Sequence, residues 1–591
     1  MLNPAFKTFT HKVDLCIVGG GLSGMCAAVA AARHGAKVAL MHERPMLGGN
    51  ASSEVRMWVC GAHGDNNLET GILEEIMLEN YYRNPDKNYS IWDGILYEIV
   101  RMEPNIDLLL NCTCTSCEMD GEAIKSVTGW QLTTQQIHTV EATLFADCSG
   151  DSVLAPLCGA EYRWGREAKS EFGEALGQEV EDTKTMGMSC MIQAREEDRP
   201  SEFIPPKWAH KFTKEDLPGR VPNMKSMYEN FWYMELGGFG DSIADSETTR
   251  DELLKIAYGM WDFVKNDPEN KEKNANWRLD WMGILPGKRE SRRYMGDHIL
   301  CQGDVEAEGR FEDIVAFGGW TMDDHDPRGF YNGGMPNVHS PAPSPYGIPY
   351  RCLYSRNVPN LLFAGRNISA THTALSSTRV MATCATMGQA MGTAAAIAIA
   401  HGTSPRGVYE NHIAELKQAL MEDDCYIPFN TRAVPELTAS AKLTCADPAA
   451  ENLRNGLDRP IGGNDNGVHV ALGECIEYDF GEEKDVSFAR IIWDSDLNRE
   501  TMPRFDGRPF GHNMLSNRPY HMPDFYVPTT MTKAFRIEGK VNGEWIVLYA
   551  NDNAYQRLSA IPLNARCSAV RLVPTATWGA ADAHIFSFDV R

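Results

Sequence analysis

The sequence contains no long apolar run, and no stretch approaches the ~20 consecutive apolar residues that a membrane-spanning helix needs. Positive charge is in deficit, with 56 Lys and Arg against 80 Asp and Glu and a formal net charge of −24. Such a chain repels nucleic acid and anionic lipid, so we expect neither as a partner. Internal repeats and low-complexity segments are also absent from the sequence.

Cysteine is too sparse for a disulfide scaffold, with 16 residues in a chain of 591. We therefore expect a reducing compartment. The opening residues MLNPAFKTFTHK have no apolar signal core, so we predict a cytoplasmic protein, or a periplasmic one if a leader has been removed. Cys112, Cys114 and Cys117 lie close together, but no second cysteine pair or histidine set accompanies them. We predict no metal site.

A buried strand followed by a glycine-rich turn stands near the start of the chain. Residues 13–18 form an apolar, β-branched run and lead directly into GGGLSG at 19–24. In a G-x-G-x-x-G of this kind, Gly19 allows the tight turn and Gly21 lets the backbone approach a pyrophosphate. Gly24 lets the next helix pack closely on the strand.

A helix and a second strand complete this unit. The alanine-rich segment 25–34 predicts a helix whose N-terminal amides and dipole point at the phosphates. After a strand over 37–41, Glu43 is placed to accept hydrogen bonds from ribose hydroxyls. Strand, glycines, helix, strand and acid in this order predict a dinucleotide-binding βαβ unit.

Two later segments end strands in small and polar residues, which suggests that the chain returns to the same nucleotide. The first is LFADCSGDS at 144–152 and the second is NLLFAGRNIS at 360–369. A polar loop through His372 and Arg379 follows the second return. The small-residue helix predicted over 380–401 then directs its N-terminus at an electron-rich group.

The composition changes twice along the rest of the chain. Residues 159–346 are richer in charge, Trp, Met and Pro, which suits a substrate-binding insertion. After a connecting helix over 406–421, short apolar strands alternate with turns such as Asn542-Gly543. This pattern predicts a C-terminal all-β sandwich.

In their order along the chain these motifs resemble the FAD-dependent oxidoreductase family of the glutathione-reductase-like superfamily, over roughly residues 12–405. The loop LGGNA at 47–51 is part of that resemblance. It implies an α/β protein with a Rossmann-like FAD-binding core, an inserted α+β substrate domain and a C-terminal all-β sandwich similar to galactose-binding-like modules. The predicted parts are residues 1–158 and 347–405 for the FAD-binding domain, 159–346 for the insertion, 406–433 for a helical linker and 434–591 for the sandwich.

The resemblance also implies a non-covalent FAD, with its adenine ribose on Glu43 and its isoalloxazine near the loop before the last long helix. Many members have Ala-Gly-Asp at the third motif, whereas this chain has Ala364-Gly365-Arg366, so the ribityl-binding carboxylate is not carried over. The residues predicted to bind FAD are Gly19, Gly21, Ser23, Gly24, Glu43, Arg44, Gly49, Asn50, Ala51, Ser52, Asp147, Gly150, Gly365, Arg366, Ser377 and Thr378.

A flavin carries the redox step, so the protein must hold the substrate and take up a hydroxyl proton. The predicted catalytic residues are His372, His325 and Arg379, with His339, Asp323 and Asp324 as further candidates. His372 lies near the expected flavin loop, although a histidine satisfied by the backbone is an alternative. His325 lies among aspartates, in the site or in a solvated acidic loop. Arg379 stabilises negative charge on the flavin or forms a structural ion pair.

Two further groups have open interpretations. The basic turn KRESRR at 288–293 either clamps a substrate carboxylate or pairs with the surplus acids. Trp232 and Trp320 either stack on a sugar or belong to the core.

We therefore predict a FAD-dependent dehydrogenase or oxidase that oxidises a polar small molecule by hydride transfer to flavin N5. A carbohydrate or glycoside hydroxyl is the favoured substrate, and the electron acceptor is left open. The alternatives are a flavin-dependent reductase of an unsaturated carboxylic acid and a redox-inactive, flavin-bearing glycan-binding protein. The sequence is also compatible with a homo-oligomer.

Overall fold

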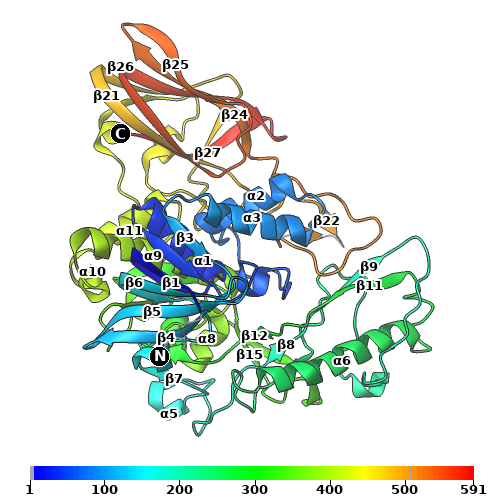
Figure 1. The fold of residues 1–591 in the computed structure, drawn as a ribbon. Coiled ribbons are helices and arrows are strands. Elements are labelled where there is room, and N and C mark those ends of the chain that lie inside the picture. Colours follow the sequence, from blue (N-terminus) through cyan, green and yellow to red (C-terminus); the bar gives the residue numbers. More distant parts are fainter. Residues whose placement is uncertain (1–5, 506–507, 510–511) are drawn as a thin grey trace. The chain divides into compact units, whose positions relative to one another are not determined.

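The computed structural model describes residues 6–505, 508–509 and 512–591, and the chain divides into two compact units (Figure 1). The first unit comprises Met1–His63, Lys87–Leu416 and His512–Met522, and the second Gly64–Asp86, Lys417–Gly511 and Pro523–Arg591. Two segments thus belong to a different unit from their sequence neighbours. The finer domain boundaries given above remain a prediction.

A seven-stranded sheet forms the core of the first unit, in the order β3-β2-β1-β6-β5-β4, with β18 also paired to β6. Its strands are β1 (Thr8–Val18), β2 (Val38–Met41), β3 (Ile106–Leu109), β4 (Cys112–Asp120), β5 (Ala123–Gln131), β6 (Gln136–Asp147) and β18 (Leu361–Phe363). Strands β3, β2, β1, β6 and β18 pair in parallel, whereas β4, β5 and β6 pair antiparallel. The Rossmann-like core is confirmed.

The register of this sheet aligns the carboxyl ends of four strands. Val18 lies opposite both Met41 and Asp147, and Asp147 lies opposite Phe363. The loops that follow β1, β2, β6 and β18 therefore leave the sheet along one edge. Open α/β sheets bind their ligands at this edge.

Helices α1 (Leu22–Arg33) and α9 (Met381–His401) pack against each other through small residues. A Cβ atom at Gly388 would lie 2.1 Å from the carbonyl oxygen of Ser23, and one at Gly392 would lie 2.2 Å from that of Ala27. Only glycine fits at either position. The sequence predicted close packing on a strand or cofactor, and the structure shows that these two glycines pack on α1 instead.

The segment before α9, predicted as a polar loop, is the helix α8 (His372–Thr378). The Thr371 hydroxyl accepts a hydrogen bond from the backbone N–H of Ala374 and so caps its N-terminus. The single helix predicted over 406–421 is two helices, α10 (Pro405–Asn411) and α11 (Ile413–Glu422). His412 between them has φ −132°, outside the helical range.

The predicted insertion contains one long helix, α6 (Ser246–Asn266). Its buried face contributes Ile256, Met260 and Trp261 to a hydrophobic cluster. The strands used below are β8 (Met188–Ser189), β10 (Glu235–Leu236), β12 (Gly287–Lys288), β15 (Met322–His325) and β16 (Asn337–Ser340).

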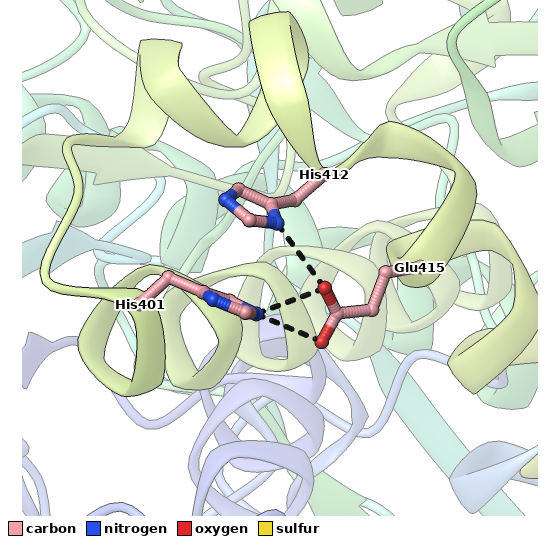
Figure 2. A group of neighbouring side chains, drawn as sticks. All are labelled: His401, His412 and Glu415. Atoms are coloured by element: carbon pink, nitrogen blue, oxygen red, sulfur yellow. Dashed lines mark hydrogen bonds and ion pairs between the residues drawn. The ribbon is translucent and has the colours of Figure 1, made fainter.

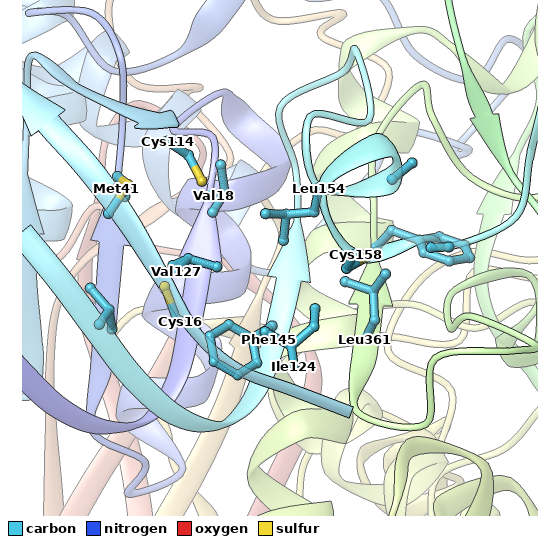
Figure 3. Packing of buried hydrophobic residues seen from close by; sticks show 14 of the residues in the cluster. Cys16, Val18, Met41, Cys114, Ile124, Val127, Phe145, Leu154, Cys158 and Leu361 are labelled. Atoms are coloured by element: carbon cyan, nitrogen blue, oxygen red, sulfur yellow. The ribbon is translucent and has the colours of Figure 1, made fainter. Parts of the chain in front are cut away.

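A cluster of buried apolar side chains includes Cys16, Val18, Met41 and Phe145 (Figure 3). Cys112 and Cys114 belong to this cluster, and burial raises the pKa of each thiol to about 12. A thiol that keeps its proton is a poor metal ligand. All sixteen cysteines lie within the described ranges, and none of them forms a disulfide bond.

The second unit contains an antiparallel seven-stranded sheet, which confirms the predicted C-terminal all-β region. Its strands are β19 (Lys442–Thr444), β20 (Val468–Ala471), β21 (Ile476–Trp493), β24 (Thr532–Val541), β25 (Glu544–Asn551), β26 (Leu558–Thr577) and β27 (Asp582–Val590). The sequence predicted short strands here, but β21 is a single strand of 18 residues. Register shifts at 479/484 and 486/488 let this long strand bend.

Strands β21 and β26 run through both halves of this sheet. The first part of β21 pairs with β19 and with the end of β26, whose end also pairs with β24. The last part of β21 pairs with β27 and with the beginning of β26.

Among the described residues, none of the helices has the length and apolar character needed to cross a membrane.

Candidate active site

The loops at the carboxyl ends of β1, β2, β6 and β18 enclose a cavity of about 120 Å³, called here the flavin cavity. Residues predicted to bind FAD that line it are Gly19, Gly21, Ser23, Glu43, Arg44, Gly49, Asn50, Gly150, Gly365 and Arg366. They come from four separate segments of the chain. The strand register brings these segments together, as the sequence predicted.

The protein backbone around the flavin cavity has the features that a dinucleotide needs. Gly21 caps the N-terminus of α1 without a side-chain hydrogen bond, so the first amides of the helix are available to a phosphate. A Cβ atom at Gly21 would approach only the Cα of Gly49, at 3.9 Å, so open space lies above this residue. A Cβ atom at Gly24 would lie 1.9 Å from the carbonyl oxygen of Gly19, so Gly24 acts through helix packing. Arg44 Nη1 is buried without a hydrogen-bond partner in the described chain.

His42 is a residue of this cavity that the sequence did not single out. Its Nδ1 accepts the backbone N–H of Gly20 at 3.0 Å, and its Nε2 donates to the carbonyl of Met46 at 2.9 Å. Burial, followed by the nearby charge of Arg44, lowers the pKa of His42 to about 4. A neutral imidazole thus ties the glycine loop to the loop after β2. Its position directly after the second predicted strand was the available signal.

Some residues predicted to bind FAD do not line the flavin cavity, namely Gly24, Ala51, Ser52, Asp147, Ser377 and Thr378. The Asp147 carboxylate accepts hydrogen bonds from the Leu154 amide and the Tyr294 hydroxyl. The Ser52 hydroxyl donates to the carbonyl of Gly49 at 2.8 Å, and Ser377 donates to that of Trp320. These side chains support the walls, and their contact with FAD remains a prediction.

A second cavity of about 350 Å³, called here the substrate cavity, adjoins the first. Asn50, Arg366, Arg379 and Met381 line both cavities. A group bound in one is therefore in reach of a group bound in the other. Of the predicted catalytic residues, His325 lines the substrate cavity and Arg379 lines both.

The hairpin of β15 and β16 supplies the polar wall of the substrate cavity. Asp323 pairs with His339 and His325 pairs with Asn337 across the two strands. Residues two apart on a strand share a face, so all four side chains point the same way. All four line the cavity. The alternation D-x-H and N-x-H was visible in the sequence, but the pairing of the two strands was not.

His325 and Asp323 are held in a buried network of ion pairs. His325 Nδ1 lies 2.6 Å from Glu235 Oε2, and its Nε2 lies 3.4 Å from Asp323 Oδ2. Arg379 Nη2 donates to Asp323 Oδ2 at 3.0 Å. Burial raises the pKa of Asp323, but the hydrogen bond from His325 and the charge of Arg379 outweigh it and hold that pKa well below its usual range. The cavity therefore contains an ionised carboxylate.

Four aromatic side chains also line the substrate cavity, namely Trp58, Tyr228, Trp232 and Trp320. Trp232 meets His325 edge-to-face, with ring centroids 5.5 Å apart. The indole N–H of Trp320 is buried and has no hydrogen-bond partner among the described residues. A buried indole N–H ordinarily has one, so this donor is available to a bound molecule.

The basic turn at 288–293 forms ion pairs inside the first unit. Lys288 Nζ lies 2.8 Å from Asp151, and Arg289 lies 3.4 Å from Glu235. Arg293 is buried against Glu167 at 3.0 Å. Of the two interpretations offered above, pairing with acids therefore describes these contacts. Arg366, in the position where related proteins have Asp, itself pairs with Asp151.

His372 lines neither cavity. Its Nδ1 lies 2.9 Å from Glu290 Oε2 and its Nε2 lies 3.0 Å from Asp324 Oδ1. Burial lowers the pKa of His372, but the two carboxylates outweigh it and raise this pKa to about 10. His372 is thus a buried cation that anchors Asp324, the neighbour of Asp323.

The fold and the two cavities define a dinucleotide-binding oxidoreductase of the flavoprotein type. A sequence model described as FAD dependent oxidoreductase matches residues 14–420. The chain therefore belongs to this family of FAD-dependent enzymes. No curated protein sequence matches the chain.

Three of the solved structures that are similar to parts of this chain are the following. A geranylgeranyl bacteriochlorophyll reductase-like protein from Thermoplasma acidophilum has 14% identity and a TM-score of 0.33, covering 70% of this chain and 86% of its own. OxyS anhydrotetracycline hydroxylase from Streptomyces rimosus has 12% identity and a TM-score of 0.33, covering 69% and 66%. The family 32 carbohydrate-binding module from Streptococcus pneumoniae EndoD has 13% identity and a TM-score of 0.19, covering 26% and 97%.

Proposed function

We propose that this FAD-dependent oxidoreductase oxidises a hydroxyl group of a polar small molecule, and that a carbohydrate or glycoside is its substrate class. The observation that carries the proposal is the substrate cavity, which shares lining residues with the flavin cavity and is lined both by aromatic side chains and by hydrogen-bonding groups. A pyranose ring has an apolar face of C–H groups and an edge of hydroxyls. Such a ring matches both kinds of lining group.

The residues that line the flavin cavity hold FAD, and the hairpin of β15 and β16 supplies the group that takes up the proton. FAD, when bound, accepts the hydride that leaves the alcohol carbon. The hydroxyl proton passes to His325, which Glu235 orients, and the ionised Asp323 stabilises the positive charge that the imidazole gains. The oxygen keeps the electron pair of the broken O–H bond and forms the carbonyl.

Arg379 has a positioning role in this scheme and a second, electrostatic one. It donates to the Asp323 carboxylate and also lines the flavin cavity. Its Nε is buried without a partner among the described residues. A cation at the junction of the two cavities stabilises negative charge that develops on either side. His372 acts one step further away, by fixing Asp324.

The alternative of an unsaturated-acid reductase is less well supported by the charges. A carboxylate clamp needs cationic groups that are available to the substrate. Lys288, Arg289 and Arg379 all line the substrate cavity, but each already pairs with a carboxylate. These carboxylates neutralise the positive charge that would otherwise bind the carboxylate of a substrate.

Anaerobic reduction of the bound flavin tests the proposal. Purified protein is mixed with a panel of aldoses, glycosides and sugar acids, and loss of the flavin absorbance near 450 nm is followed. We expect reduction by at least one sugar-like alcohol, and a rise of about 10-fold or more in its KM in Trp320→Ala, which removes the stacking wall. Trp208→Ala is the matched control, because Trp208 is half exposed and does not line the cavity.

Two results would redirect the proposal. Oxidation of pre-reduced protein by enoates alone would favour the reductase, and a flavin that responds to no donor or acceptor would favour a redox-inactive binding protein.

A further inference from the structure

A group of two histidines and one aspartate lies on the antiparallel sheet of the second unit. His469 on β20 and His584 on β27 are directly opposite each other in the strand register. Their rings are parallel within 2°, with centroids 4.3 Å apart. Asp465 lies 3.0 Å from Nε2 of His584 and 3.8 Å from Nε2 of His469. The three side chains offer ligand atoms that all lie within 4.8 Å of one another.

The second ring nitrogen of each histidine contacts a further carboxylate. His584 Nδ1 lies 3.1 Å from Asp494 Oδ2, and His469 Nδ1 lies 3.2 Å from Asp582 Oδ1. Histidines that bind metals typically donate their other N–H to a carboxylate, which fixes the tautomer and leaves the free nitrogen for the metal. Here both outer carboxylates are in place, and both Nε2 atoms face Asp465.

The Nε2 atom of His584 lacks a hydrogen bond in the described chain. It is buried, and Oδ1 of Asp465 lies 3.0 Å from it as an ion pair. A metal ion between these two atoms would satisfy the imidazole nitrogen.

We propose that Asp465, His469 and His584 bind a divalent transition metal ion of the Zn²⁺ class. Two imidazole nitrogens and one carboxylate oxygen form a ligand set that Zn²⁺, Co²⁺ and Ni²⁺ accept. Metal–ligand bonds of about 2.0–2.1 Å place tetrahedral ligand atoms about 3.3 Å apart, between the two separations measured at Asp465. Asp465 and His469 are about half exposed, so the fourth position is open to water or to a ligand.

A second histidine–carboxylate group in the chain provides a comparison, and it belongs to the first unit. In Figure 2, His401 and His412 both point at Glu415, with Nε2 of His401 at 2.9 Å and Nδ1 of His412 at 3.2 Å from the same oxygen. Among the described residues, no carboxylate contacts the other ring nitrogen of either histidine. The carboxylate is already the acceptor for both rings, so we assign no metal to this group and use it as the control.

Isothermal titration of the full-length, FAD-loaded protein with ZnCl₂, after EDTA treatment and desalting, tests the proposal. We expect one site per chain that is lost in His469→Ala and in His584→Ala. Asp494→Asn and Asp582→Asn leave all three ligands in place, and each should weaken Zn²⁺ binding by about 10–100-fold. A purely structural role for these aspartates would not move the affinity. The site is argued independently of the reaction proposed above, and flavin reduction is not part of the readout.

The control is the double variant His401→Ala/His412→Ala, which should bind Zn²⁺ as the unaltered protein does. His469 is half exposed, so His469→Ala should fold even if the more buried His584→Ala does not, and circular dichroism checks both. Absence of Zn²⁺ binding in the unaltered protein overturns the proposal. So does binding that survives His469→Ala, or binding that disappears only in the His401/His412 variant.

Discussion

Buried charged side chains occur in both units, but they enclose very different amounts of space. In the first unit, Asp323, His325 and Arg379 border a cavity of about 350 Å³. In the second unit, Arg432 and Arg490 both pair with Asp458, at 3.2 and 2.8 Å. The cavity beside this second network is only about 20 Å³, which is room for roughly one water molecule.

The difference shows that buried ion pairs alone do not identify an active site. The Arg432–Asp458–Arg490 network fills its own space, and Asp589, which also pairs with both arginines, balances the second positive charge. The network around Asp323 leaves one wall open and retains unsatisfied donors, such as the indole N–H of Trp320. Changes to the first network should therefore alter activity, and changes to the second should alter stability.

The largest expected effect is the loss of the cofactor. Gly24→Val places side-chain atoms where even a Cβ would lie 1.9 Å from the carbonyl oxygen of Gly19, so α1 must move away from the glycine loop. We expect colourless protein with no activity, measured by the flavin absorbance after gel filtration. Gly94→Ala is the matched control, because a Cβ there meets no atom within 4 Å and alanine favours the helix by about 1 kcal/mol.

The next effect is on the rate. Asp323→Asn removes the ionised carboxylate that we propose stabilises His325 as this imidazole takes up the proton, so flavin reduction should slow by about 10²–10⁴-fold. Stopped-flow spectroscopy at 450 nm measures the rate of flavin reduction, and the flavin content of the variant should be unchanged. A variant that reduces its flavin at the normal rate would remove Asp323 from the mechanism.

The reverse pattern is expected in the second unit. Asp458→Asn leaves Arg432 and Arg490 with Asp589 as their one shared carboxylate, and breaking a buried ion pair of this kind costs about 3–5 kcal/mol of the free energy of unfolding. The melting temperature should fall, whereas flavin content and the rate of flavin reduction at low temperature should not. If Asp458→Asn slowed the reaction as strongly as Asp323→Asn, the comparison between the networks would fail.

The smallest effect is a pH dependence of stability. The pKa of His372 is raised from 6.5 to about 10 in the folded protein, so between these values the folded state binds a proton that the unfolded state does not. The stabilisation is complete below about pH 6.5 and is lost as the pH rises toward 10, with a slope of at most about 1.4 kcal/mol per pH unit. His372→Gln should flatten this decline in melting temperature. An equally steep decline in the variant would assign it to other groups.

The flavin cavity was largely predictable from the sequence because its determinants are local. A strand, a glycine turn and a helix are adjacent along the chain, and each return ends a strand in small residues. The exceptions are instructive. His42 follows its strand directly and was missed, and the Asp147 carboxylate proved to be occupied by a backbone amide and a tyrosine.

The substrate cavity was much less predictable because its contacts are distant in sequence. Glu235 lies 90 residues before His325, and Arg379 lies 56 residues after Asp323. Pairing Asp323 with His339 needs the register of a hairpin, which no local pattern specifies. The return of His512–Met522 to the first unit, where the side chain of Asn513 accepts the backbone N–H of Val59, had no signal in the sequence.

The long strands β21 and β26 have a mechanical consequence for the second unit. Because each one supplies hydrogen bonds to both halves of the sheet, neither half has a seam along which it could detach. Amide protons in the two halves should exchange with deuterium as a single block, and a protease cut within β21 should unravel both together.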